Sequence, residues 1–267
     1  MNEHALKISL ASLPISQIRF FEEIGSTNDE ALAWLSKEAS AGGAHDGCLV
    51  VANSQNSGRG RLGRRWVTRP DSSLAFSLIL RPTPGEVERL AYFSPLGALA
   101  ICQAFEHIGL APLIKWPNDV LLQRRKAAGI LVEVAWLGDQ LQGVVIGIGL
   151  NVAADSVPPA DQLLFPAISV EEAAGRPVER MDLLGAILTN LFAWRGRLLD
   201  SSFLQGWEQR LAFRGEWVRL EAGGRDALTG QVMGIDANGS LLLRTRNGET
   251  AAITVGDIHL RPLDSAM

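Results

Sequence analysis

Short apolar runs alternate with polar or proline-rich segments along most of this chain. Runs at 48–52 and 74–80 are bounded in this way and are typical of buried strands. The same pattern predicts further strands at 113–116, 129–136 and 142–151. Two longer stretches predict helices: 86–108, which is largely apolar despite Pro95, and 181–210, where apolar residues recur at helical spacing. The chain up to about residue 212 is therefore predicted to be mixed α and β.

A further helix is predicted close to residue 26. Residues 31–35 are rich in alanine and leucine, and Thr27 followed by Glu30 matches a capping box. We therefore expect a polar loop that enters a helix at this point.

The pattern of apolar and polar residues changes near Arg214. From there, short apolar strands are separated by glycine and asparagine turns, and Asn238-Gly239 is a hairpin signal between two of them. This pattern predicts a small all-β barrel. We therefore expect two domains, at 1–212 and 213–267.

Composition excludes several classes of protein. The chain has 267 residues, 47% of them hydrophobic and 20% charged, as is ordinary for a soluble, folded protein. The longest uncharged, mostly apolar run, 90–105, is shorter than a bilayer span, and the N-terminus lacks a secretory pattern, so we expect a cytoplasmic protein. Cys48 and Cys102 lie far apart in apolar contexts and are expected to be buried, reduced thiols.

The positive charge of the chain is local. Its formal net charge of -4 and pI near 5.6 argue against broad nucleic-acid binding, yet residues 58–66 carry four arginines in a glycine-rich loop. Glycine lets backbone N–H groups turn toward a ligand, and guanidinium groups bind phosphate or carboxylate. This loop therefore predicts an anion site, although a nucleic-acid contact or a solvated surface turn is open on these residues alone.

Three other segments carry candidate chemistry, each with a simpler alternative. The segment 115–119 (Lys-Trp-Pro-Asn-Asp) ends a strand and could bind a ligand's polar edge or form an ordinary Asx turn. Lys126, followed by small residues, could contact a ligand or lie in water at a hairpin turn. The polar residues 26–28 could bind a urea-like edge or cap a helix, and 147–151 (Gly-Ile-Gly-Leu-Asn) could be a plain buried strand. The four histidines show no pairing that indicates a triad or a metal site.

Taken together and in this order, the motifs resemble those of biotin protein ligases. The resemblance covers the chain from about residue 20 to the end, including a C-terminal segment, 256–261, that is similar to the closing strand of the family's small barrel. It implies an α+β fold, with a mixed-sheet catalytic domain of the class II synthetase-like type followed by an SH3-like β-barrel. The residues that carry it are Ser26, Thr27, Asn28, Gln55, Gly58, Arg59, Gly60, Arg61, Gly63, Lys115, Trp116, Pro117, Asn118, Asp119, Arg125, Lys126, Ala128, Gly129, Ile130, Gly147, Gly149 and Asn151.

The resemblance implies that the protein activates biotin with ATP to biotinyl-5′-AMP and passes the biotinyl group to a lysine of a carboxylase's biotin carrier domain. Lys126 would then hold the biotin carboxylate and the α-phosphate together, with Arg61 in the loop that closes over them, and Asp119 would orient the incoming lysine. The remaining implied substrate contacts are Ser26, Thr27 and Gln55 at the biotin ureido end, Asn28 in support of that turn, Arg59 and Gly60 in the closing loop, Gly129 beside the adenylate, and Asn118, Asn151 and Trp66 on the nucleotide side.

The resemblance also implies Mg²⁺ as the counter-ion of ATP, although the sequence shows no dedicated carboxylate cage. Only about two dozen residues precede Ser26, too few for the DNA-binding domain that some members of the family carry, so we expect no repressor function. An exposed strand edge would allow a homodimer. The rival readings are a lipoate- or octanoate-transferring relative and a nucleic-acid-binding module.

Overall fold

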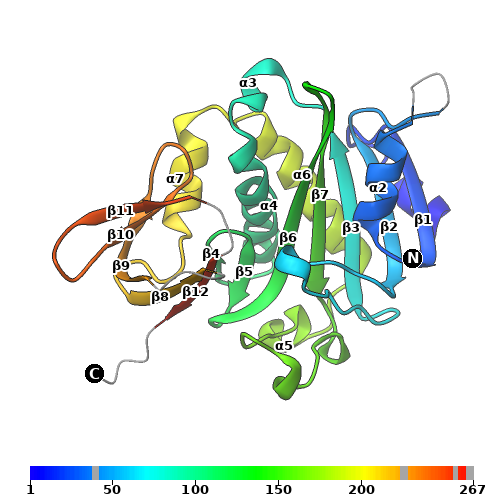
Figure 1. Ribbon diagram of the computed structural model, residues 1–267. Coiled ribbons are helices and arrows are strands. Elements are labelled where there is room, and N and C mark those ends of the chain that lie inside the picture. Colours follow the sequence, from blue (N-terminus) through cyan, green and yellow to red (C-terminus); the bar gives the residue numbers. More distant parts are fainter. Residues whose placement is uncertain (38–41, 223–227, 255–257, 263–267) are drawn as a thin grey trace.

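A computed structural model describes residues 1–37, 42–222, 228–254 and 258–262 (Figure 1). Its larger sheet has seven strands in the order β1-β2-β3-β7-β6-β5-β4. The first two strands run parallel and all other neighbours run antiparallel, which confirms the predicted mixed sheet. The strands are β1 Gln17–Ile24, β2 Cys48–Gln55, β3 Ser73–Leu80, β4 Pro112–Lys115, β5 Asp119–Leu122, β6 Arg125–Leu137 and β7 Gln140–Asn151.

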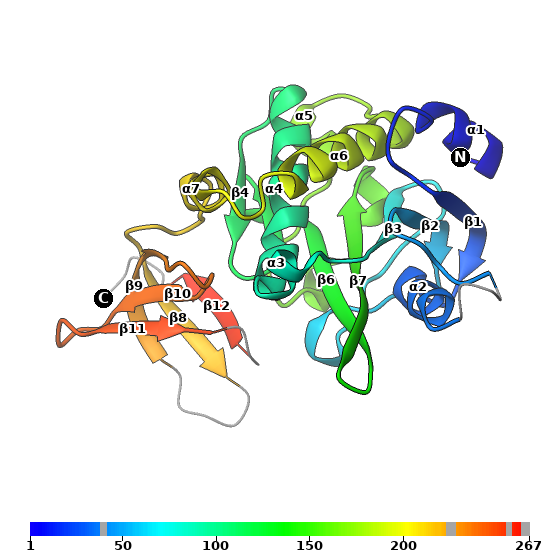
Figure 2. The same ribbon diagram turned by 90° about the horizontal axis from the view of Figure 1, so that it is seen from above.

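Helices cover both faces of this sheet. Figure 2 shows α4 (Phe93–His107) and α6 (Arg180–Arg195) on one face and α2 (Thr27–Leu35) on the other. Helix α4 packs directly on the sheet at Gly97, where a Cβ would lie in ordinary contact with the side chains of Ile130, at 3.4 Å, and Ile146, at 3.5 Å. The shorter helices are α1 Glu3–Ser9, α3 Pro84–Val87, α5 Val170–Ala174 and α7 Ser201–Gln209, and 3₁₀ turns lie at η2 Arg61–Gly63, η3 Leu90–Tyr92, η4 Ala154–Ser156 and η5 Ala160–Gln162.

The two faces bury different side chains because strand residues alternate between them. Along β7, the even-numbered residues from Val144 to Leu150 join the large core under α4 and α6. The odd-numbered residues face α2, where Val145 joins a small apolar cluster and the next two are Gly147 and Gly149. The glycines leave open space on the α2 face.

Two predicted helices are interrupted. The predicted helix at 86–108 is three pieces, α3, η3 and α4, because a capping box formed by Thr83 and Glu86 starts a separate short helix. Pro95 then falls in the first turn of α4, where its missing N–H has no helical acceptor to lose. The predicted helix at 181–210 is also split, into α6 and α7, with Asp200 as the N-cap of the second. Strands β1 and β5 were not predicted at all.

The C-terminal part is a second, antiparallel sheet with the order β11-β10-β9-β8-β12. Its strands are β8 Trp217–Ala222, β9 Leu228–Ile235, β10 Leu241–Arg244, β11 Thr250–Ile253 and β12 Ile258–Pro262. The Asn238-Gly239 hairpin is confirmed: Gly239 has φ +82°, and the turn closes through Asp236 and Ser240. Of the predicted closing strand, 256–257 lies outside the described residues, and the rest pairs with β8. The fold class is confirmed, and the 1–212 and 213–267 domain limits stay a prediction.

The small sheet packs against the larger one beside the 115–119 segment. The indole Nε1 of Trp116 donates to the carbonyl of Gly239 at 3.1 Å, and the Tyr92 hydroxyl donates to that of Ala237 at 2.6 Å. Within the described residues no helix is long and apolar enough to cross a membrane. Both cysteines are free and buried, as predicted, and burial raises the pKa of the Cys102 thiol.

Candidate functional site

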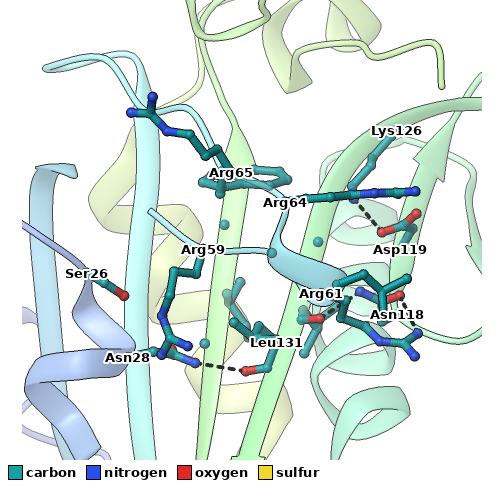
Figure 3. A pocket seen from close by; sticks show the side chains of 18 of the residues that line it. Ser26, Asn28, Arg59, Arg61, Arg64, Arg65, Asn118, Asp119, Lys126 and Leu131 are labelled. Carbon is teal, nitrogen blue, oxygen red and sulfur yellow. Dashed lines mark hydrogen bonds and ion pairs between the residues drawn. The ribbon is translucent and has the colours of Figure 1, made fainter. Parts of the chain in front are cut away.

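A pocket opens on the α2 face of the large sheet (Figure 3). Every predicted site residue except Asn151 lines it. The lining comes from the start of α2, the end of β2, the arginine loop and strands β4 to β7. The lining residues are Ser26, Thr27, Asn28, Gln55, Arg59, Gly60, Arg61, Leu62, Arg64, Arg65, Trp66, Lys115, Trp116, Pro117, Asn118, Asp119, Lys126, Gly129, Ile130, Leu131, Gly147, Ile148 and Gly149.

The floor of the pocket is formed by two glycines on neighbouring strands. Gly149 of β7 is paired in register with Gly129 of β6, and Gly129 is paired with Asp119 of β5. A Cβ on Gly149 would lie 2.4 Å from the ring of Trp66, so this indole rests directly on the strand backbone. Neither Gly129 nor Gly149 has a positive φ, so backbone conformation does not require a glycine at these positions. The glycines are needed because other groups approach the strand backbone closely there.

Small polar groups gather at one end of this floor. Gln55 Oε1 accepts from the backbone N–H of Thr27 at 2.8 Å and from its hydroxyl at 3.1 Å. The hydroxyl of Ser77 lies 2.8 Å from Thr27 Oγ1 and 2.6 Å from Asn28 Oδ1. Because Ser26, Thr27 and Asn28 are all nearly buried, this network orients donors and acceptors before any ligand arrives.

The predicted capping box at Thr27 and Glu30 is wrong. The N-cap is Ser26, whose Oγ accepts from the N–H of Asp29 at 3.4 Å, and Thr27 is the first helical residue. Glu30 instead accepts from Arg19 at 2.6 Å. The cap lies one residue earlier because Gln55, distant in sequence, satisfies the N–H of Thr27.

The turn at Asn28 depends on Glu133 and Ser77, two residues that the sequence analysis did not identify. Asn28 Nδ2 donates to Glu133 at 2.8 Å and to the carbonyl of Leu131 at 3.2 Å, and Ser77 holds the amide from its oxygen side. A Cβ on Gly147 would lie 2.0 Å from Asn28 Oδ1. Glu133 is the one charged residue in the stretch 127–137 of β6, which is the signal that could have identified it.

The arginine loop connects β2 and β3, as predicted, and has defined hydrogen bonds. The N–H of Trp66 donates to Gly58 at 2.8 Å, and the N–H of Gly60 donates to Arg64 at 2.7 Å. Leu62 adopts φ 61° in the tight turn between them. A Cβ on Gly58 would lie 2.4 Å from the carbonyl oxygen of Trp66, which explains the glycine at the base of the loop.

Two of the loop arginines are held in different ways. Arg59 forms a bidentate pair with Glu133, at 2.9 and 2.6 Å, and an ion pair with Asp29 at 2.6 Å. Arg61 donates to the side-chain oxygen of Asn118 at 3.3 Å, and Figure 3 shows the two side chains next to each other. Arg59 is thus bound to carboxylates at the polar end, whereas Arg61 lies toward the lysines.

The opposite end of the floor holds one carboxylate between two ammonium groups. Asp119 Oδ1 lies 2.6 Å from Lys126 Nζ, and Asp119 Oδ2 lies 3.0 Å from Lys115 Nζ. Burial acts to raise the pKa of Asp119, but the two lysines outweigh it and hold this pKa well below its usual range. The cluster therefore carries a net charge of about +1 and is arranged to receive an anion.

The two predicted asparagines lie differently. Asn118 Nδ2 donates to the carbonyl of Ile130 at 2.9 Å, which ties the 115–119 turn to β6 at the pocket wall. Asn151 is buried and lies behind the pocket, where Nδ2 donates to the carbonyls of Lys126 at 3.4 Å and Ile168 at 3.5 Å. The structure thus brings Asn118 to the pocket and leaves Asn151 supporting the backbone of Lys126.

Known proteins share both halves of this arrangement. Residues 20–151 match the Biotin/lipoate A/B protein ligase family, and residues 214–261 match the Biotin protein ligase C terminal domain. The biotin–[acetyl-CoA-carboxylase] ligase of Paracoccus denitrificans is 36% identical over 82% of this chain and 90% of that protein. The corresponding ligase of Mycobacterium tuberculosis is 32% identical over 92% of this chain and 90% of that protein.

A solved structure shows the same likeness in three dimensions. The biotin protein ligase of Aquifex aeolicus in complex with biotin and ATP has a TM-score of 0.78 and 28% identity, over 93% of this chain and 100% of that one. The likeness therefore extends across the large sheet, the pocket and the C-terminal sheet.

Proposed function

The chain belongs to the biotin protein ligase family, and we propose that it is the enzyme that joins biotin to a carrier protein in two steps. A biotin carboxylate oxygen attacks the α-phosphorus of ATP and pyrophosphate leaves, which forms biotinyl-5′-AMP. The amine of an acceptor lysine then attacks the acyl carbon, AMP leaves, and an amide is formed. The observation that carries this proposal is that Lys126, paired with Asp119, lies at one end of the pocket and the polar Thr27–Gln55 pair at the other, with a glycine floor between them.

The polar end suits the ureido group of biotin. A urea offers a carbonyl acceptor and two N–H donors, and Ser26, Thr27 and Gln55 supply both kinds of partner there. Asn28 supports that turn through its bonds to Ser77 and Glu133. The apolar ring and chain of biotin would then run over the glycines toward Lys126.

The cationic end suits the reacting groups. Lys126 would hold the biotin carboxylate and the α-phosphate together, and it would stabilise the negative charge that develops at phosphorus without losing its proton. Arg61, with Arg59 and Gly60 in the same loop, would close over the adenylate, and Gly129 allows the adenylate to approach the strand. Lys126 is suited to this because its side chain is 26% exposed toward the pocket.

The nucleotide side is proposed for Trp66, Asn118 and Asn151. The Nε1 of Trp66 is buried and has no hydrogen-bond partner among the described residues, which supports a role in contacting an acceptor on a ligand. Asn118 presents its amide at the pocket wall next to Arg61. Asn151 would act on the nucleotide side through the Lys126 backbone that it holds.

Mg²⁺ is proposed as the counter-ion of ATP, and we assign it no ligand from this chain. No group of three or more metal-ligating side chains occurs among the described residues. Asp119 is the one carboxylate among the described residues that line the pocket, and it is already paired with two lysines. The phosphates and water would therefore coordinate the ion, whose charge would offset that of the triphosphate.

The proposed acceptor is a lysine of a biotin carrier domain in the cytoplasm. With an ordinary pKa of about 10.4, fewer than about one in a thousand such amines is neutral at pH 7. Asp119 could accept a hydrogen bond from this amine and orient it toward the acyl carbon.

The edge strand β1 supports a proposal of homodimer formation, and the acidic pI supports the absence of a nucleic-acid partner.

Pyrophosphate release by the purified protein with Mg-ATP tests the proposal. We expect release with biotin and not with octanoate or lipoate, and a loss of at least about 100-fold in Lys126→Ala and Arg61→Ala. Lys7→Ala, which alters an exposed ion pair with Glu3 far from the pocket, is the matched control and is expected to be unaffected. Release that requires octanoate or lipoate would assign the site to that acyltransferase branch, and no release with any acid would refute the proposal.

A further inference from the structure

Lys115 is a buried lysine for which the proposed reaction so far has no use. The whole residue is 9% exposed, and its ammonium lies 3.0 Å from Asp119 Oδ2 and 4.7 Å from the centre of the Phe165 ring. A lysine is rarely buried so deeply unless its charge is needed, because taking an ammonium group out of water is costly. The Asp119–Lys126 pair would neutralise that carboxylate without it.

The two lysines approach Asp119 from different directions. Lys115 pairs with Asp119 directly across β4 and β5, with a side chain 11% exposed. Lys126 comes from β6, its side chain is 26% exposed, and its ammonium lies 5.4 Å from the centre of the Trp66 ring on the pocket floor. Figure 3 shows Lys126 and Asp119 facing each other at the pocket wall. Both lysines line the pocket, but Lys115 is the more deeply buried of the two and Lys126 presents more of its side chain to the space for a ligand.

We propose that Lys115 is a positioning residue that keeps Asp119 paired and in place when Lys126 turns to the substrate. This inference rests on the proposed function, in which Lys126 holds the biotin carboxylate and the α-phosphate. When Lys126 exchanges Asp119 Oδ1 for a substrate oxygen, Asp119 keeps one cation at Oδ2. The carboxylate then stays ionised and correctly placed for the acceptor amine.

Without Lys115, Lys126 would have two competing anions. Leaving Asp119 would strand a buried carboxylate with no counter-charge, which costs far more than losing a surface ion pair. Lys126 would therefore remain on Asp119, and the substrate anion would have to displace it. The exchange moves an ion pair and no proton, so removing the charge of Asp119 should release Lys126 again.

A double-mutant cycle on adenylate formation tests this. We expect Lys115→Met to lower kcat/KM for biotin in pyrophosphate release by at least about 10-fold in the wild-type background. The same substitution in the Asp119→Asn background is expected to lower it by less than about threefold, because an amide does not retain Lys126. Lys7→Met is the matched control, a lysine that also has an acidic partner four residues away, and it is expected to change neither background.

Three outcomes are decisive. Equal losses in the two backgrounds would show that Lys115 acts through packing, and the proposal would fail. It would fail equally if Lys115→Met matched the wild type. If Lys115→Met does not fold by circular dichroism, Lys115→Gln takes its place in the cycle, and Lys115→Arg, which keeps the charge, is expected to lose less than either. A wild-type protein without biotin-dependent release would instead refute the proposed function, so the two failures are distinguishable.

Discussion

The two faces of the large sheet are built from the same strands but do opposite work. Toward α4, strands β3 and β7 present Phe76 and Ile146, both fully buried in the main core. Toward α2, the neighbouring residues along the same strands are Ser77 and Gly147, which hold the Asn28 turn. The α4 face is filled by packed apolar side chains, whereas the glycines on the α2 face leave space for a ligand. Alternation along a strand thus lets stability and ligand binding be specified at adjacent residues.

Helix α2 shows the same division along its length. Its second half covers a small apolar cluster with Trp34 and Leu35, whereas its first turn contributes Ser26, Thr27 and Asn28 to the pocket. The buried half anchors the helix and so places the polar turn at the pocket.

The largest expected effect comes from filling the pocket face. In Gly149→Val, the new Cβ would lie 2.4 Å from the Trp66 ring, and its methyl groups would occupy the floor. We expect biotin-dependent pyrophosphate release to fall about 1,000-fold, equivalent to about 4 kcal/mol. The free energy of unfolding is expected to change by less than about 1 kcal/mol, because valine favours strands and Trp66 lies on a loop that can shift.

Activity assays and urea unfolding on the same preparation separate these effects. Gly138→Val, at the tip of the β6–β7 hairpin with no atoms within 4 Å of a Cβ, is unsuitable as a control because its φ is +56°. Gly185, in α6, has only Leu10 near a Cβ, at 3.9 Å, so Gly185→Ala is the matched control and is expected to leave activity unchanged. Retained activity in Gly149→Val would contradict the role given to the floor.

The opposite face should respond in the opposite way. Ile146 lies on the same strand as Gly149 but faces the core under α4. Ile146→Ala is expected to lower the free energy of unfolding by about 3 kcal/mol, because it leaves a cavity. Below its melting temperature, kcat/KM for biotin is expected to stay within about threefold of the wild type. Urea unfolding followed by tryptophan fluorescence measures the first quantity. A loss of activity as large as that of Gly149→Val would show that the two faces are not independent.

Local patterns predicted much of this frame. Apolar runs located β2, β3, β4, β6 and β7, and the asparagine–glycine pair located the hairpin of the small sheet. The error at 86–108 has a local cause, because the Thr83 and Glu86 capping box spans the start of the stretch that was predicted to be one helix. Strand β1 was missed because Arg19, Glu22 and Glu23 interrupt its apolar residues. Strand β5 was missed because the segment 115–119 was interpreted as a turn, and β5 begins at Asp119.

The site could be predicted only as far as its motifs. Clustering of the motifs followed from their order, but their partners did not. Glu133 bonds to Asn28 across 105 residues, and Phe165 covers Lys115 from a loop after β7. Such pairings depend on sheet order and register, which no local pattern contains. The N-cap error at Thr27 has the same origin, because the group that satisfies its N–H is Gln55.

The smallest expected effect comes from the charged end of the pocket, where Asp119 lies between Lys115 and Lys126. Asp119→Asn is expected to lower the free energy of unfolding at pH 7 by about 2 kcal/mol, because Lys115 and Lys126 lose a buried partner. The folded protein holds the pKa of Asp119 below its unfolded value of about 3.9, so this stabilisation is present above that pH and is lost as the pH falls below it. Urea unfolding at a series of pH values should therefore show the two proteins converging in acid. A difference that stays constant from pH 7 to pH 3 would mean that the carboxylate's charge does not stabilise the fold, and that this end of the pocket, like the glycine floor, is arranged for the ligand alone.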